Sequence, residues 1–345
     1  MSTQLVTSIE SRTFVTKLDK VLFTTTDDTV DITVEADGLT LLSETYTPDA
    51  SGKVTLWDLC SLLTPYLKET LVSPVKITYT SVGNDDPLES NFIVIYTSAF
   101  IEQSSADFIA GHFLTHLTEK TTAIGRIERL YLYHNASIVN ARCTAHYSDG
   151  TENVTYLPYN YMTDYDRIYP VDCSPAQFVI TGKTLTDYTI AYNDRIMRFI
   201  LEPPREIGVS VAFINSFGCA ETLYCSGTHE LEPEYERKAA YVEGNYINVS
   251  IDETKKFKAY TGTLTTAMSN WADDLFRSPS VRILQQNGNL GREITITDAK
   301  AVRKNDDDYL PDFYFEYRFA QRNNNIIDNA QSWRIFDDSF DYSFN

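Results

Sequence analysis

The sequence predicts an all-β protein built from tandem β-sandwich domains, of jelly-roll or immunoglobulin-like type, with a few short helices. Three observations support this fold class. Apolar and polar residues alternate with period two in many short segments, turn residues separate those segments, and helical periodicity is confined to two stretches. Closely spaced strands joined by turns are typical of sandwiches and partly open barrels.

Residues 1–100 are expected to form the first sandwich. Alternation at residues 30–36, followed by an Asp-Gly pair, indicates a hairpin. One helix is expected to interrupt this domain at about residues 55–68, where leucines recur at helical spacing. Thr55 is its expected N-cap, and Pro65 is expected to kink or end it.

Residues 101–232 are expected to form a second sandwich, entered through a polar connector at its start. Alternation at residues 139–147, a Ser-Asp-Gly turn and a return at 154–157 predict a hairpin. Residues 188–201, with Asn-Asp between two apolar runs, predict another hairpin.

Residues 233–345 are expected to form a C-terminal β-rich domain with one helix and an aromatic tail. Apolar residues at helical spacing place this helix at about 264–277, with Thr263 as its N-cap. A strongly β segment follows, and its alternating aromatic residues are Phe313, Phe315, Tyr317 and Phe319.

Composition and charge limit the function classes. The 345 residues include 48 acidic and 29 basic side chains, which gives a net charge of -19. Binding nucleic acid requires clustered Lys and Arg, so no nucleic-acid partner is expected. No apolar run predicts membrane insertion, and the N-terminus lacks the pattern of a signal peptide. Five cysteines, an odd and low number, fit a reducing compartment. We therefore expect the protein to be made in a cytoplasm and to stay there or in a particle assembled there.

The sequence contains two groups of residue types that can bind metals. His112 and His116 have i, i+4 spacing, but they lack the glutamate of a metalloprotease motif and further ligands. We interpret them as surface or interface histidines. Cys219 and Cys225, with Cys173 elsewhere in the chain, do not have zinc-finger spacing and are expected to be small buried residues.

The sequence contains two clusters of acidic residues. Glu230, Glu232, Glu234 and Glu236 alternate with other residues, so in a strand their carboxylates share one face. Pro233 indicates an edge strand or connector, which favours a solvated stripe or a contact with a basic partner over a catalytic pair.

Residues 305–308, together with Asp312, form the second acidic cluster. They could hold a hard cation but lack the glycine and glutamate of an EF-hand loop, so a charged hairpin loop is expected. The sequence contains no GxSxG, P-loop or GxGxxG motif. We therefore expect no catalytic residues, no metal and no cofactor.

The tail is aromatic in an alternating pattern. Trp333, Phe336, Phe340, Tyr342 and Phe344 are the expected subunit-interface residues. One interpretation makes this tail the last strand of its own domain. A second makes it a strand donated to a neighbouring subunit by β-augmentation, and a third makes it disordered.

Several stretches are similar to poorly characterised structural proteins encoded in tail modules of prophages from gut bacteria. They touch all three thirds of the chain: Glu44–Asp58, Asn215–Thr222, Pro233–Arg237, Trp271–Pro279, Glu293–Asp298 and Phe313–Arg318. The resemblance implies a role in a virion or in tail assembly, oligomerisation and no catalysis. It provides no functional residues to carry over.

These observations lead to one leading hypothesis and two alternatives. The leading hypothesis is a non-enzymatic structural protein of a phage tail or tail-like particle that contacts other particle proteins or copies of itself. Its 23 tyrosines suit interfaces, because the ring buries area while the hydroxyl keeps a partner. The first alternative is a carbohydrate-binding protein, which would have a glycan partner. The second, ranked last, is a glycan-active hydrolase with two facing carboxylates in a cleft.

Overall fold

The computed structural model describes residues 3–81, 87–203, 208–285, 287–304 and 310–321. Over these residues the expected all-β fold is confirmed, because five sheets, mostly antiparallel, dominate the structure and only three α-helices accompany them. The predicted interface residues of the tail and the acidic run at 305–308 lie outside the described residues. No helix formed by the described residues combines the length and the apolar character needed to cross a membrane.

The N-terminal unit is a sandwich of two sheets with one core. The smaller sheet has the order β1 (Thr3–Leu5), β3 (Lys20–Thr25), β6 (Lys53–Trp57). The larger sheet has the order β2 (Arg12–Phe14), β8 (Leu88–Ile95), β7 (Val72–Ser81), β4 (Val30–Ala36), β5 (Leu39–Tyr46). The predicted hairpin is β4–β5, and the alternate residues of β4 are buried between the sheets.

The helix of this unit, α1 (Leu59–Thr70), corrects two predictions. Its N-cap is Asp58, whose side chain accepts a hydrogen bond from the Ser61 amide, whereas Thr55 lies in β6. Pro65 does not end the helix, which continues for five more residues. Burial of Leu63 and Leu67, on either side of the proline, offsets the lost backbone hydrogen bond, which costs roughly 3 kcal/mol.

The middle of the chain forms a five-stranded sheet and a two-stranded ribbon. The sheet has the order β12 (Glu152–Tyr156), β11 (Ala141–Tyr147), β14 (Leu185–Tyr192), β15 (Arg195–Leu201), β9 (Glu119–Thr122). The ribbon pairs β10 (Arg129–His134) with β13 (Arg167–Asp172), and α2 (Ser105–Gly111) precedes both. Both predicted hairpins, β11–β12 and β14–β15, are present.

The C-terminal half forms a seven-stranded sheet with one helix, α3 (Thr266–Arg277), which is capped by Thr265 rather than Thr263. The sheet has the order β17 (Ala220–Cys225), β16 (Val209–Ile214), β20 (Val281–Leu284), β21 (Leu290–Lys300), β22 (Asp312–Phe319), β19 (Asn245–Thr263), β18 (His229–Val242). The predicted apolar face of α3 is buried, and so are the alternating aromatic residues of β22.

The expected boundary after residue 232 does not separate two sheets. It falls inside β18, and β16 and β17 pair within the C-terminal sheet. The five- and seven-stranded sheets also share one hydrophobic core, in which Tyr188 and Phe199 lie in the same cluster as Phe315 and Trp271. β16 belongs to the C-terminal sheet because it pairs with β20, which is distant in the sequence. Local alternation of apolar and polar residues does not predict such a pairing.

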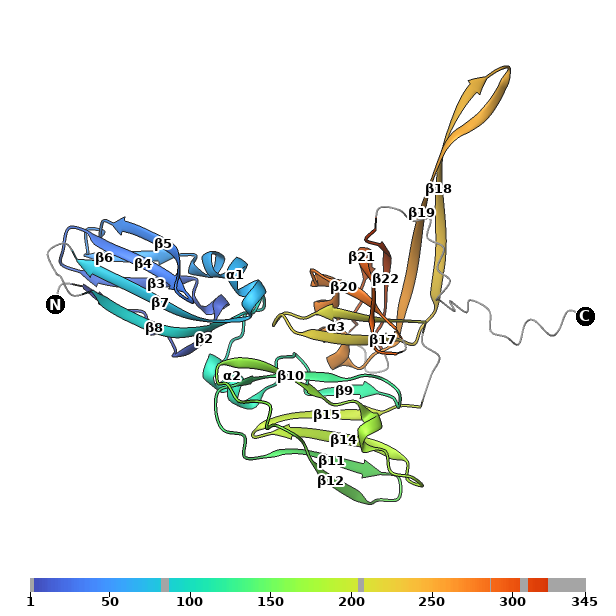
Figure 1. The fold of residues 1–345 in the computed structure, drawn as a ribbon, viewed down its shortest axis with the longest axis horizontal. Coiled ribbons are helices and arrows are strands. Elements are labelled where there is room, and N and C mark those ends of the chain that lie inside the picture. The colour runs from blue at the N-terminus through green and yellow to red at the C-terminus, as the bar shows by residue number, and fades with distance from the viewer. Residues whose placement is uncertain (1–2, 82–86, 204–207, 286, 305–309, 322–345) are drawn as a thin grey trace, which may run out of the picture.

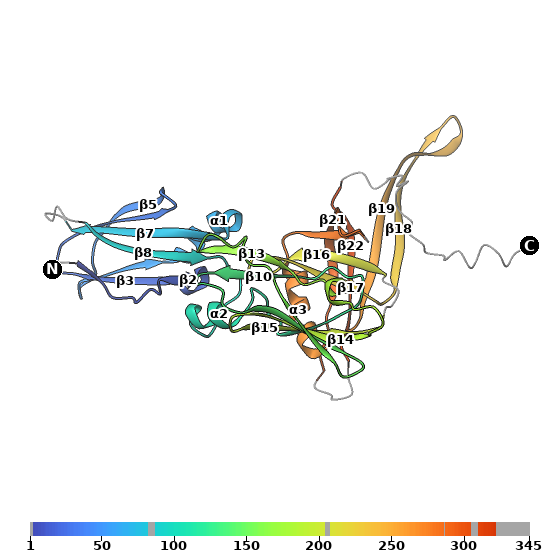
Figure 2. The ribbon, with the colours of Figure 1, turned by 60° about the horizontal axis from the view of Figure 1, so that its bottom comes forward.

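A compact junction joins the N-terminal sandwich to the rest of the chain (Figures 1 and 2). Phe14 packs against Phe217 within a small buried cluster that both parts supply. Arg12 donates to Asp166 at 2.6 Å, and the Tyr133 hydroxyl donates to the same carboxylate at 2.6 Å. These contacts attach the sandwich firmly to the body, at the end of the molecule away from the β18–β19 hairpin.

Candidate interaction site, the β18–β19 arm

The most prominent surface feature is a long hairpin that leaves the body. Strands β18 and β19 pair over almost their whole length, but β19 pairs with β22 only from Phe257 onward. Residues 230–256 therefore project as a two-stranded ribbon, which we call the arm (Figures 1 and 2). With a rise of roughly 3.3 Å per residue, the arm reaches about 40 Å from its root.

The root of the arm is packed into the body. The His229 ring stacks with Phe257 at 5.6 Å and with Tyr317 at 5.9 Å between ring centroids. Its Nε2 lies 2.8 Å from the Tyr317 hydroxyl. Burial lowers the pKa of His229 to about 4, so the ring is neutral near pH 7. A Cβ on Gly227 would lie 2.6 Å from the Cβ of Tyr260, so this close packing requires glycine.

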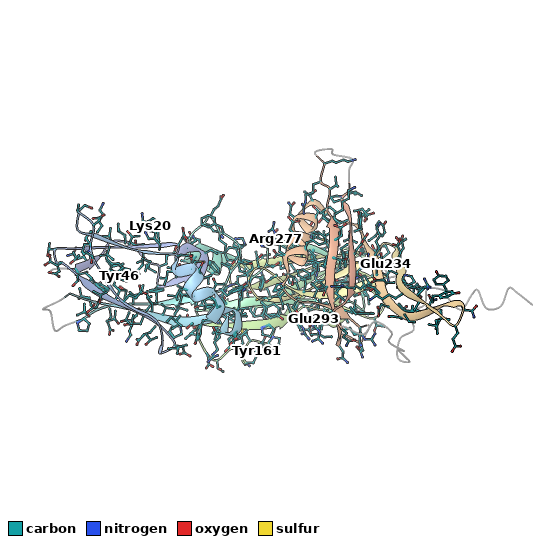
Figure 3. All side chains as sticks on the ribbon, turned by 90° about the horizontal axis from the view of Figure 1, so that it is seen from above. Lys20, Tyr46, Tyr161, Glu234, Arg277 and Glu293 are labelled. Carbon is teal, nitrogen blue, oxygen red and sulfur yellow. The ribbon has the colours of Figure 1, made fainter. Side chains whose placement is uncertain are left out.

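The base of the arm carries the glutamate stripe predicted from the sequence. Glu230, Glu232, Glu234 and Glu236 lie on one face of β18, opposite β19, and Glu234 forms a 2.5 Å ion pair with Lys256. Glu234 is labelled on this ribbon in Figure 3. The four glutamates follow one another along a strand, so they form a solvated stripe rather than a pair of carboxylates that face each other across a cleft.

The tip is a two-residue turn whose positive φ angles define it. Glu243 has φ 52° and Gly244 has φ 84°, as a type I′ turn requires, and Tyr241 faces Tyr246 directly below it. Such a turn makes Val242 and Asn245 a hydrogen-bonded pair. Hydrogen-bonded and non-hydrogen-bonded positions alternate along β18, so Val242 and Glu234 are of the first kind and Pro233 is of the second. The nitrogen of Pro233 therefore points to the free edge, where no ladder hydrogen bond is lost.

The outer arm, residues 237–251, lies beyond the Glu236–Asp252 pair, is apolar near its tip and is exposed on both faces. Between Ala239 and Ile251 the sequence has a single charged residue, Glu243. The exposed fractions of the large side chains there are 80% for Tyr246, 65% for Tyr241, 58% for Val249 and 56% for Ile251. An isolated two-stranded hairpin is marginally stable in water, and exposed apolar patches mark interaction sites. The exposed apolar residues of the outer arm therefore make it the candidate interaction site of the described structure.

The two predicted histidines do not form a site. Helix α2 ends at Gly111, so His112 and His116 are not on one helix. His112 stacks on Phe108, whereas His116 Nε2 lies 3.3 Å from the Asp274 carboxylate. Among the described residues, no group of three or more His, Cys, Asp and Glu side chains could hold a metal ion.

The predicted burial of Cys173, Cys219 and Cys225 is confirmed, and Cys143 is buried as well. Cys143, Cys173, Cys219 and Cys225 are buried free thiols, and Cys60 is half-buried. Burial raises the pKa of Cys143 and of Cys225 to about 12, so these thiols are unreactive. Asp312 begins β22, but the other residues of its acidic run lie outside the described residues.

A buried polar network between α3 and the strands around it was not predicted from the sequence. Lys120 Nζ donates to Glu128 at 2.6 Å. The Trp271 indole donates to Glu221, and burial raises the pKa of that carboxyl group. Asp274 accepts from the Ser216 hydroxyl at 2.5 Å. These carboxylates are enclosed and hydrogen-bonded within the core, so they are suited to specifying its packing rather than to acting on a substrate.

An open groove of about 520 Å³ crosses the N-terminal sheet at β8, β7 and β4. Its polar lining includes Arg12, Glu35, Lys76 and Asn91, and its single aromatic residue, Phe92, is buried. Arg12 is bound to Asp166, and Lys76 forms a 2.7 Å ion pair with Glu35. The groove lacks an exposed ring on which a sugar could stack.

The sequence predicts only some features of the arm. The alternation of Ile247, Val249 and Ile251 predicts a strand, and the glutamates predict an exposed edge. The near absence of charge around Glu243-Gly244 is the sequence feature that marks the apolar tip. Because period-two alternation also marks strands that are covered in their own domain, the exposure of these residues became visible only in the structure.

Comparisons with known proteins do not identify a family. No family model matches the chain, and no curated protein matches it. A crystal structure of Rst D1-D2 is 8% identical, covers 59% of this chain and 99% of its own, and has a TM-score of 0.26. A 1.5-MDa bacterial ice-binding adhesin, studied for host cell surface retention, is 9% identical, covers 81% of this chain and 90% of its own, and has a TM-score of 0.17. Both scores are too low to assign a function.

Proposed function

We propose that the protein is a structural component of a phage tail or tail-like particle and that the arm is its main contact with other subunits. The observation that carries this proposal is the outer arm, whose apolar residues are exposed on both faces of a hairpin. Contact between apolar surface and water is unfavourable, so a partner that covers these residues lowers the free energy.

The rest of the molecule is suited to holding the arm in a defined position. The root is fixed by the His229 stack, and the body behind it shares one core across two sheets. The junction at Arg12 and Asp166 holds the N-terminal sandwich in place. A stiff body with a projecting hairpin can set the spacing between neighbours in a particle.

A shortened-arm variant tests the proposal. Replacing residues 237–251 by Asn-Gly joins Glu236 to Asp252, a directly paired position, through a type I′ turn. We expect the wild type to sediment with the particles produced by its own host genome and to be located in them by electron microscopy, while the variant stays in the supernatant. Normal incorporation of a folded short-arm variant would contradict the proposal.

Carbohydrate binding is the second candidate function, and exposed tyrosines are the observation that favours it. Tyr156, Tyr159, Tyr161 and Tyr165 all expose more than two fifths of their surface, and Tyr161 is labelled in Figure 3. Aromatic faces of this kind can stack on sugar rings. A glycan array with the wild type and a Tyr156→Ala variant checks it: glycan binding that the substitution abolishes supports this function, and no binding contradicts it.

A further inference from the structure

We infer that the partner of the outer arm is a second copy of this chain, and that the arm docks by strand addition along β12 of that copy. The inference rests on the proposed function, because it names the partner of the same arm. It is carried by an unprotected sheet edge, by complementary charge and by the positions of the two surfaces.

Strand β12 is an exposed sheet edge without the usual protection. It ends the five-stranded sheet, and all five of its residues are exposed. Residues 153–156 read Asn-Val-Thr-Tyr, which is uncharged and favours strands, and Val154 and Tyr156 expose 47% and 83% of their surface. Natural sheets protect such edges with charges, proline or a covering segment. An edge that lacks these devices is suited to accept a strand.

The base of the arm shows what protection looks like in this chain. There the free edge of β18 has the nitrogen of Pro233 directed outward, with charged neighbours such as Glu232 and Glu234. The outer arm has no proline between residues 237 and 251. Both the outer arm and β12 are therefore open to pairing, whereas the base of the arm is not.

The charges of the two surfaces are complementary. The outer arm has two basic residues and one acidic residue, in a chain with 29 basic and 48 acidic residues overall. Residues 149–166, which contain β12 and the loop after it, have four acidic residues and no Lys or Arg. Two of these acids, Asp149 and Asp166, pair with basic residues of the chain, whereas the side chains of Glu152 and Asp164 are 64% and 63% exposed. Arg237 and Lys238 flank the apolar tip and can approach these two exposed carboxylates as the apolar residues meet. Complementary charge of this kind fixes orientation and suppresses wrong partners.

The two surfaces lie at opposite ends of the body. In Figure 1 the arm projects from the upper right of the molecule, while β12 forms its lower edge. An arm therefore cannot reach β12 of its own chain, and the contact joins copies head to tail. Such heterologous contacts close into rings or continue into filaments.

Mixing two variants tests this inference. The arm variant is Y246E/V249E, and the edge variant is V154K/Y156K; all four residues are exposed, so each variant is expected to fold, as circular dichroism and thermal melting will verify. We expect the wild type to form species larger than its 39.3 kDa monomer, and each variant alone to be monomeric. An equimolar mixture should form one dimer, because one intact arm meets one intact edge. Light scattering coupled to gel filtration measures all three.

The control is W57K, which places a lysine at an equally exposed aromatic position of the N-terminal sandwich and should oligomerise like the wild type.

A wild type that stays monomeric at the highest concentration overturns the inference, as does a mixture that forms no dimer. So does a glycan that binds the edge through Tyr156 and leaves oligomerisation unchanged. If the arm variant is excluded from particles but the mixture does not pair, the proposed function stands and the second copy is the wrong partner. If the arm variant enters particles normally, both proposals fail.

Discussion

The buried polar network and the arm differ in whether the chain itself provides contacts for their side chains. Between α3 and the neighbouring strands, Lys120, Glu128 and Glu221 are enclosed, and each has a partner from its own chain. On the outer arm, Tyr246 and Val249 are 80% and 58% exposed, and the described residues provide no layer that covers them. Within the described part of the chain, the polar groups of this network are paired, whereas the apolar surface of the outer arm is left exposed.

This difference predicts opposite responses to substitution. A change in the body should lower the free energy of unfolding and leave the contact surface intact. A change on the outer arm should leave the free energy of unfolding almost unchanged and remove assembly.

Trp271→Ala should have the largest effect. The indole is fully buried, packs against Phe213 and donates to Glu221, so its loss leaves a cavity and a carboxylate without this donor. We expect a loss of about 3–5 kcal/mol in the free energy of unfolding. Urea denaturation measures it. Trp57→Ala is the matched control, because Trp57 is 67% exposed and its loss should change stability little.

Gly218→Ala should disrupt the junction. Gly218 has φ 76°, and a Cβ there would lie 2.4 Å from the Leu71 Cδ2 atom. We expect a loss of about 1–3 kcal/mol and faster hydrogen exchange in α1 and β8, measured by mass spectrometry. Gly38→Ala separates the two causes, because Gly38 also has a positive φ but nothing lies within 4 Å of its Cβ position. Equal effects of both substitutions would show that the junction contact is unimportant.

Acidification should weaken the root of the arm. The pKa of His229 is lowered from 6.5 to about 4, so the unfolded chain takes up a proton at a higher pH than the folded chain does. The stability from this group is therefore fully present above pH 6.5 and is lost as the pH falls toward 4. Thermal melting across this range measures it, and His229→Gln should flatten the dependence. An unchanged pH profile in that variant would contradict this assignment.

Substitution at the tip should have the smallest effect on stability. Tyr246→Ser with Val249→Ser should change the free energy of unfolding by less than about 0.5 kcal/mol, because both side chains are already exposed. The same variant should lose oligomers in light scattering. Val139→Ser, at a position that is 87% exposed on the body, should change neither quantity. A large loss of stability in the tip variant would mean that the arm is covered by its own chain.

Much of the fold could be predicted from local patterns. The two middle hairpins, the buried face of α3 and the aromatic face of β22 all appear where alternation or helical spacing places them. These elements are determined by residues close together in the chain, so their pattern can be recognised in a single sequence. The glutamate stripe could be placed on an edge strand because Pro233 restricts where that strand can lie.

Other features could not be predicted, because distant contacts decide them. Thr55 has the residue type of a helix cap, but pairing with Leu22 places it in β6. Pro65 has the residue type of a helix end, but burial of its neighbours keeps it inside α1. The C-terminal sheet begins at β16, before the expected boundary, because β16 pairs with β20 across some 70 residues.

By itself, the sequence determined an acidic, strand-rich chain with alternating aromatic faces, and it determined where most of its turns lie. Only the tertiary structure decided which of those apolar faces would be covered. Alternation shows that a strand has an apolar face, but the layer that covers that face comes from elsewhere in the chain or from another molecule. For the aromatic residues of β22 the described part of the chain supplies that layer, and for the outer arm it does not.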